Sequence, residues 1–62
     1  MNTKEWTQVD VDSFVRFIRE AGGQVVEVFG FMNGGYSFDI RPPQNALPNW
    51  AQEQMNKFVS QR

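Results

Sequence analysis

The chain contains no cysteine and no histidine, and these two absences restrict its chemistry. Without cysteine there are no disulfides, and without either residue type the common zinc ligand sets are missing. No thiol is present to act as a nucleophile, and no imidazole is present to exchange protons near neutral pH. The serines Ser13, Ser37 and Ser60 have no obvious activating neighbour. We therefore predict that the protein is not an enzyme and has no catalytic residues, no metal site and no cofactor.

The chain also lacks a strong charge of either sign and any long apolar run. Six basic and seven acidic residues give a net charge of −1, whereas nucleic-acid binders typically show a basic excess on one face. No apolar run approaches the roughly 20 residues of a membrane span. No secretory signal is visible near the N-terminus. These features disfavour nucleic acid as a partner, predict no membrane association, and make the cytoplasm the expected compartment.

Aromatic side chains are abundant: two tryptophans, one tyrosine and six phenylalanines occur among 62 residues. Aromatics bury the largest area per side chain, so they provide material for a core. A domain of this size nevertheless buries only about 60% of the surface that its unfolded chain exposes. Without disulfides or a metal, good packing or oligomerisation must supply the stability. We predict one small domain over residues 1–62.

Two stretches repeat apolar residues at the three- and four-residue steps of an amphipathic helix. The first contains Val11, Phe14, Val15, Phe17, Ile18 and Ala21. Asp10, or Thr7 one turn earlier, can cap its start, and Gly22-Gly23 ends it. The second contains Leu47, Trp50, Ala51, Met55, Phe58 and Val59, and Pro48 suits its first turn. We therefore predict a helix at each end of the chain.

The segment between the two helices predicts a β-hairpin. Gln24–Phe31 is rich in valine and phenylalanine, and Tyr36–Arg41 alternates apolar and polar residues. Asn33-Gly34-Gly35 suits a tight turn, and Pro42-Pro43 ends the second strand. The predicted fold is α+β, with α-β-β-α order and two helices packed on one face of a two-stranded antiparallel hairpin. Trp6 fits either a place across one end of the core or an exposed position before the first helix.

The length of the turn decides which face of the hairpin meets the helices, because side chains alternate along a strand. We favour a two-residue turn at Asn33-Gly34, the strongest short hairpin signal, which pairs Phe31 with Tyr36. That register directs inward Glu27, Phe29, Phe31, Tyr36, Phe38 and Ile40, and outward Val26, Val28, Ser37, Asp39 and Arg41. A three-residue loop pairs Met32 with Tyr36. It instead turns Val26 and Val28 inward, and Phe29 and Phe31 outward.

Either register leaves apolar residues on the outside of the hairpin, next to unpaired strand edges that favour pairing with another chain. We predict a small non-catalytic binding protein of the regulatory or adaptor type, acting by protein–protein interaction with a different protein or as a homodimer. The predicted partner-binding residues are Val26, Val28, Asp39 and Arg41. The alternative is a nucleic-acid-binding module in which bases stack on hairpin aromatics. Its predicted residues are Phe29, Phe31, Tyr36 and Arg41. Phenylalanines facing inward favour the first function, and phenylalanines facing outward beside arginines strengthen the second.

Overall fold

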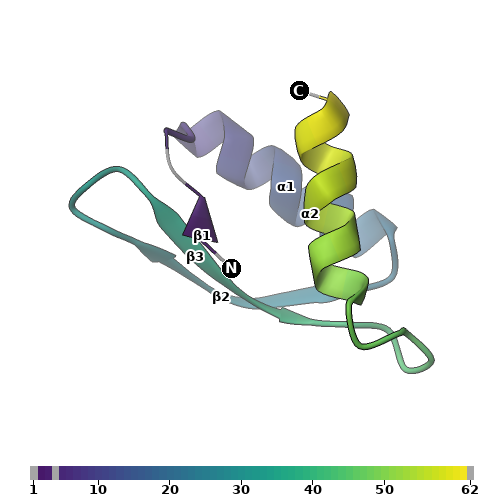
Figure 1. The fold of residues 1–62 in the computed structure, drawn as a ribbon. Helices are drawn as coiled ribbons and strands as arrows, with labels where there is room; N and C mark the ends of the chain where they lie inside the picture. The colour runs from purple at the N-terminus through teal and green to yellow at the C-terminus, as the bar shows by residue number, and fades with distance from the viewer. Residues whose placement is uncertain (1, 4, 62) are drawn as a thin grey trace.

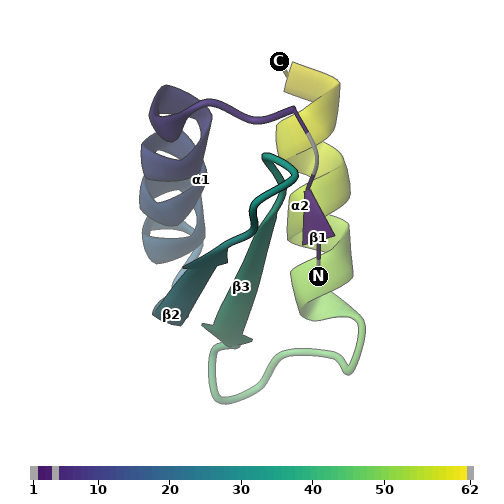
Figure 2. The same cartoon turned by 90° about the vertical axis from the view of Figure 1, so that its left-hand side faces the viewer.

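The computed structural model describes residues 2–3 and 5–61 and places two helices on one face of an antiparallel sheet (Figure 1). The elements are β1 (Asn2–Thr3), α1 (Gln8–Glu20), β2 (Gln24–Gly30), β3 (Tyr36–Arg41) and α2 (Trp50–Gln61). A quarter turn of the view shows α1 and α2 next to each other behind the hairpin (Figure 2). The predicted α+β fold with α-β-β-α order is confirmed. The short strand β1 is an addition, and it makes β3 the central strand of the sheet.

Helix α1 is closed at both ends by local hydrogen bonds. The Thr7 hydroxyl accepts from the Asp10 backbone N–H at 3.3 Å, and the Asp10 carboxylate accepts from the Thr7 backbone N–H at 2.9 Å. This capping box satisfies two otherwise unpaired donors, so Thr7 is the cap and Asp10 completes it. At the other end Gly22 has φ of 93°, and the Gly23 N–H donates to the Ile18 carbonyl at 2.9 Å. The glycine pair therefore ends α1 as predicted.

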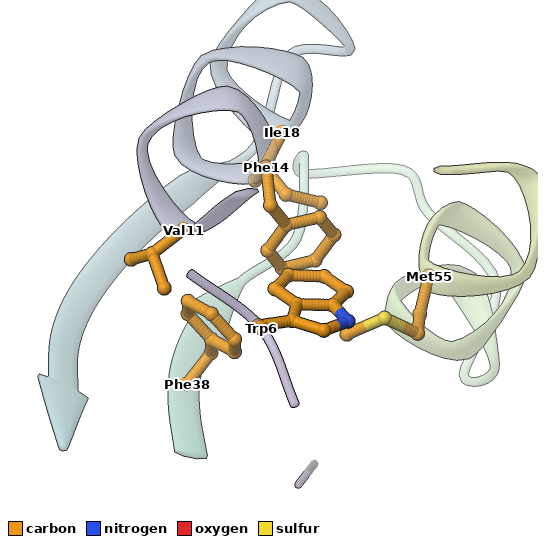
Figure 3. Close-up of a cluster of buried hydrophobic side chains, with 6 residues drawn as sticks. All are labelled: Trp6, Val11, Phe14, Ile18, Phe38 and Met55. Atoms are coloured by element: carbon orange, nitrogen blue, oxygen red, sulfur yellow. The ribbon is translucent and has the colours of Figure 1, made fainter. Parts of the chain in front are cut away.

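The core is an aromatic cluster around Phe14, which is 0% exposed. Trp6 packs on it edge to face with 5.5 Å between ring centroids, and Phe38 does so at 4.8 Å (Figure 3). The other buried apolar residues are Val11, Ile18 and Met55. Trp6 is only 7% exposed and its ring lies 5.2 Å from that of Phe58, so it connects the N-terminal segment to both helices and β3. Trp6 is thus a core residue, and the alternative prediction of an exposed position before the first helix is wrong.

Helix α2 contacts the core through fewer residues than its apolar stripe predicted. Met55 is buried, and the Phe58 ring lies 5.3 Å from that of Phe14. Leu47 and Val59, both predicted members of the stripe, are 66% and 50% exposed. The helix starts at Trp50, whose N–H donates to the Leu47 carbonyl at 3.0 Å. Pro48 therefore lies in the turn before α2 rather than in its first helical turn.

Both predicted hairpin registers are wrong, because Tyr36 pairs with Gly30. The Phe31 N–H donates to the Gly35 carbonyl at 2.9 Å, and the Gly34 N–H donates to the Phe31 carbonyl at 3.1 Å. Gly34 has φ of 85°, as in the common three-residue loop that ends in a left-handed glycine. The favoured two-residue turn would need positive φ at Asn33 as well, which Asn33 does not have. Its side-chain oxygen instead accepts from the Gly35 N–H at 3.0 Å.

The true register, together with a β-bulge, decides which hairpin side chains face the helices. Val28 pairs with Phe38 and Glu27 with Asp39, but Val25 pairs with Ile40, so Val26 is an extra residue in β2. The inward residues of β3 are Tyr36, Phe38 and Ile40, as predicted. Phe29 and Phe31 are about half exposed (50% and 48%) on the opposite face, contrary to the favoured register. The three-residue alternative had this face right, although its strand pairs are wrong. Glu27 faces outward with them, so the core contains no carboxylate from the hairpin.

Gly23 is expected to tolerate no side chain. A Cβ atom there would clash with Cη2 of Trp50 and would lie 2.8 Å from Cζ3 of Trp50 and 3.1 Å from Cγ2 of Ile18. We expect Gly23→Ala to lower the free energy of unfolding by about 1–3 kcal/mol through overpacking, measured by urea denaturation. Gly30→Ala is the control, because a Cβ there meets Tyr36 at an ordinary 3.6 Å. Equal losses in the two variants would contradict this account.

Trp6 is expected to be essential for folding. Truncation of a buried tryptophan to alanine costs about 3–5 kcal/mol, which is comparable to the whole stability of a small domain. We therefore expect Trp6→Ala to be largely unfolded at 25 °C by far-ultraviolet circular dichroism. Val9→Ala on α1 is the control, since Val9 is 72% exposed. A Trp6→Ala variant that melts within a few degrees of the wild type would overturn this role.

Candidate functional site

The hairpin surface that faces away from the helices is the candidate functional site, and we call it the outer face. Its residues on β2, the loop and β3 are Val26, Glu27, Phe29, Phe31, Ser37, Asp39 and Arg41. All of them except Ser37 are exposed, and Ser37 is half-buried. Met32 follows at the tip of the loop and is fully exposed. The outer face therefore combines apolar side chains with two carboxylates and one guanidinium group.

The structure separates the four predicted partner-binding residues. Val26, Asp39 and Arg41 lie on the outer face, as the favoured register placed them. Val28 does not, because it lies opposite the buried Phe38 on the face that meets the helices, where it is 38% exposed. The one-residue shift in register turns Val28 inward. The bulge then keeps Val26 on the outer face, since an inserted residue breaks strict alternation along the bulged strand. No sequence signal distinguished Val26 from Val28.

The residues predicted for nucleic-acid binding are also divided between two faces. Phe29 and Phe31 are on the outer face, two residues apart on the same strand and its continuation. Tyr36 is half-buried against the core and faces Gly30 across the hairpin. Ser37 is the strand partner of Phe29, and Arg41 lies four residues beyond Ser37. Four residues span about 13 Å along a strand, so Arg41 is far from both phenylalanines. The expected three-ring stacking platform is therefore absent from the described hairpin.

Two carboxylates lie between the exposed phenylalanines and Arg41. Glu27 and Asp39 are directly opposite each other on neighbouring strands, although the favoured register had put them on opposite faces. Within residues 2–3 and 5–61, neither carboxylate has an ion-pair partner. Like charges at directly opposite positions destabilise a sheet. The centre of the outer face is therefore negative and favours a cation.

The outer face adjoins the edge of the sheet that β2 forms, which no other strand of the described residues pairs with. In residues 2–3 and 5–61, β2 pairs with β3 alone, while β1 pairs with β3 at Tyr36 and Ser37 on the other side. Hydrogen-bonded and non-bonded pairs alternate in an antiparallel ladder, and Phe31 with Gly35 is a bonded pair. By this alternation Val28 and Gly30 direct their N–H and C=O groups away from β3. Such groups are a template for pairing with another chain.

A shallow hollow of about 340 Å³ lies between the two helices. Its lining residues are Asp10, Ser13, Arg16, Phe17, Glu20, Phe58 and Gln61. Asp10 is already engaged in the capping box. Across the described residues, no group of three or more acidic, histidine or cysteine side chains is arranged to hold a metal.

Comparison with known proteins leaves the function to be argued from this surface. No family model, curated protein or solved structure matches the chain. In the part of the chain that the structure describes, neither helix has the length and apolar character needed to span a bilayer. A proposal about function therefore rests on the outer face and the open edge of β2.

The repulsion between Glu27 and Asp39 can be measured by a double-mutant cycle. We expect Glu27→Gln and Asp39→Asn each to raise the free energy of unfolding by a few tenths of a kcal/mol, because each removes the same like-charge contact. The double variant should gain less than the two single gains added together. Urea denaturation at low salt gives the four values. Strictly additive gains, or a coupling that is unchanged in 1 M salt, would contradict a direct electrostatic contact.

Proposed function

We propose that this chain is a small, non-catalytic binding protein of the regulatory or adaptor type that works in the cytoplasm by protein–protein interaction. The observation that supports this proposal is the exposure of Val26, Phe29 and Phe31, each about half exposed (49%, 50% and 48%) on a face that the core does not use. Aromatic residues are enriched at protein interfaces. Their position beside the open edge of β2 adds backbone groups that a partner chain can bind.

Nucleic acid is the alternative partner, and the outward-facing phenylalanines are the feature that supports it. Two other features oppose it. Tyr36 faces the core rather than the outer face, and Glu27 and Asp39 separate the phenylalanines from Arg41. Because a nucleic-acid backbone carries one negative charge per phosphate, these carboxylates would repel it. We therefore prefer a protein partner.

A second copy of the chain is one form that a protein partner can take. Pairing of two β2 strands would bring together two copies of Gln24–Gly30, a segment with one glutamate and no basic residue. The negative charge at Glu27 then has no cation to meet in the other β2 strand. We therefore favour a different protein over a homodimer, and sedimentation equilibrium at high micromolar concentration tests this preference.

The proposed function is tested by site-specific photo-crosslinking in cells of the native host. A benzophenone amino acid replaces Phe29 on the outer face, and the control replaces Val9, which is 72% exposed on α1. We expect irradiation to produce a discrete protein adduct from position 29 and not from position 9. Mass spectrometry of the adduct distinguishes a different protein from a second copy.

Three outcomes would contradict the proposed function. Position 29 could give no adduct, the two positions could give the same adducts, or position 29 could crosslink nucleic acid instead. The last outcome would establish the alternative function, and it is checked by nuclease treatment of the adduct. A fluorescence titration of the purified protein with single-stranded oligonucleotides at low salt provides an independent measurement. The protein-partner proposal expects no binding at tens of micromolar.

A further inference from the structure

We propose that the open edge of β2 binds an extended segment of the partner that carries a lysine or arginine, which pairs with Glu27. This inference rests on the proposed function and adds to it the conformation and charge of the occupant. The segment would extend the sheet as a new edge strand beside β2. Three observations support it: the open backbone edge, the unpaired carboxylates and the spacing of the apolar residues.

The backbone of β2 determines that the occupant is extended. Val28 and Gly30 direct their N–H and C=O groups away from β3. They are two residues apart, which is the repeat of an antiparallel ladder. A strand that pairs with them satisfies both groups at once, whereas a helix presents no free backbone partners along its side. The bulge at Val26 twists the strand and limits regular pairing to the part of β2 that follows it. The paired segment is therefore short and centred on residues 27–30.

The charges of the outer face determine that the occupant is basic. The side chain that lies next to Glu27 on the added strand has its Cβ about 5 Å from that of Glu27. Asp39 lies one strand further on the same face, so both carboxylates attract a cation at that position. A lysine or arginine there would relieve the like-charge contact within the hairpin. A carboxylate there would add a third negative charge and would be rejected.

The side-chain pattern of β2 predicts the sequence around the basic residue. Phe29 follows Glu27 by two residues on the same face, so the occupant places an apolar side chain two residues from its lysine or arginine. The intervening residue lies beside Val28, which is 38% exposed on the other face. A β-branched residue suits that position because it packs well on a half-buried strand surface. The expected motif is a basic residue, a β-branched residue and an apolar residue in either chain direction.

The test is selection from a random decapeptide display library on two forms of the full chain. The first is the wild type, and the second is the charge-reversed variant Glu27→Lys/Asp39→Lys, whose folding is checked by circular dichroism. We expect wild-type protein to enrich peptides with lysine or arginine two positions from an apolar residue. The reversed variant should enrich acidic peptides with the same apolar spacing. A shared set of selected peptides, or no enrichment on either form, would overturn the proposal.

Selected peptides then test the site itself. We expect the variant Glu27→Gln/Asp39→Asn to bind the wild-type selected peptides about tenfold more weakly, measured by fluorescence anisotropy. Hydrogen exchange should show that bound peptide protects the amides of Val28 and Gly30. The variant Glu53→Gln, on an exposed position of α2, is the matched control and should bind like the wild type. Protection confined to the helices would refute the site.

Failure of this inference can be distinguished from failure of the proposed function. If peptides without a basic residue bind the outer face, or if a folded partner crosslinks to position 29 without protecting the amides of β2, then the proposed function stands and the extended basic occupant is wrong. If neither peptides nor proteins contact the outer face, both are wrong.

Discussion

Trp6 lies against Phe14 in an edge-to-face contact with 5.5 Å between their ring centroids, and the other elements are arranged around this pair. Phe14 is completely buried, and its ring is also within 5.3 Å of those of Phe38 on β3 and Phe58 on α2. One residue of α1 thereby contacts the N-terminal segment, β3 and α2. Because the chain has no disulfide, its stability depends on the packing of this cluster.

The same cluster explains why the outer face exists. Packing against Phe14 requires Phe38 to face inward, and alternation then turns Ser37 and Asp39 outward together with their partners Phe29 and Glu27. The core therefore uses one side of β3 and leaves the aromatic residues of β2 and the loop unused. The exposed phenylalanines are a consequence of register rather than of weak packing, and they are available to a partner.

The chemistry of the outer face narrows the classes of partner. Apolar exposure alone would suit a protein, a second copy of the chain or the bases of a nucleic acid. The carboxylates of Glu27 and Asp39 at its centre oppose phosphates, and the composition of β2 opposes self-pairing. Our proposal is therefore a protein partner that brings its own positive charge. The open strand edge favours an extended segment as the part of that protein that binds.

Local sequence patterns determined the elements whose causes are themselves local. The helical repeat of Val11, Phe14 and Ile18, the glycine pair after α1 and the alternation of β3 each depend on residues a few positions apart, and each was predictable. The tertiary structure decided the hairpin register, the bulge at Val26, the pairing of β1 and the burial of Trp6. Asn33-Gly34 is compatible with more than one turn, so the choice depends on contacts between β3, α1 and α2. The identity of the outer face follows from that choice, because a shift of one residue exchanges the two faces of a strand.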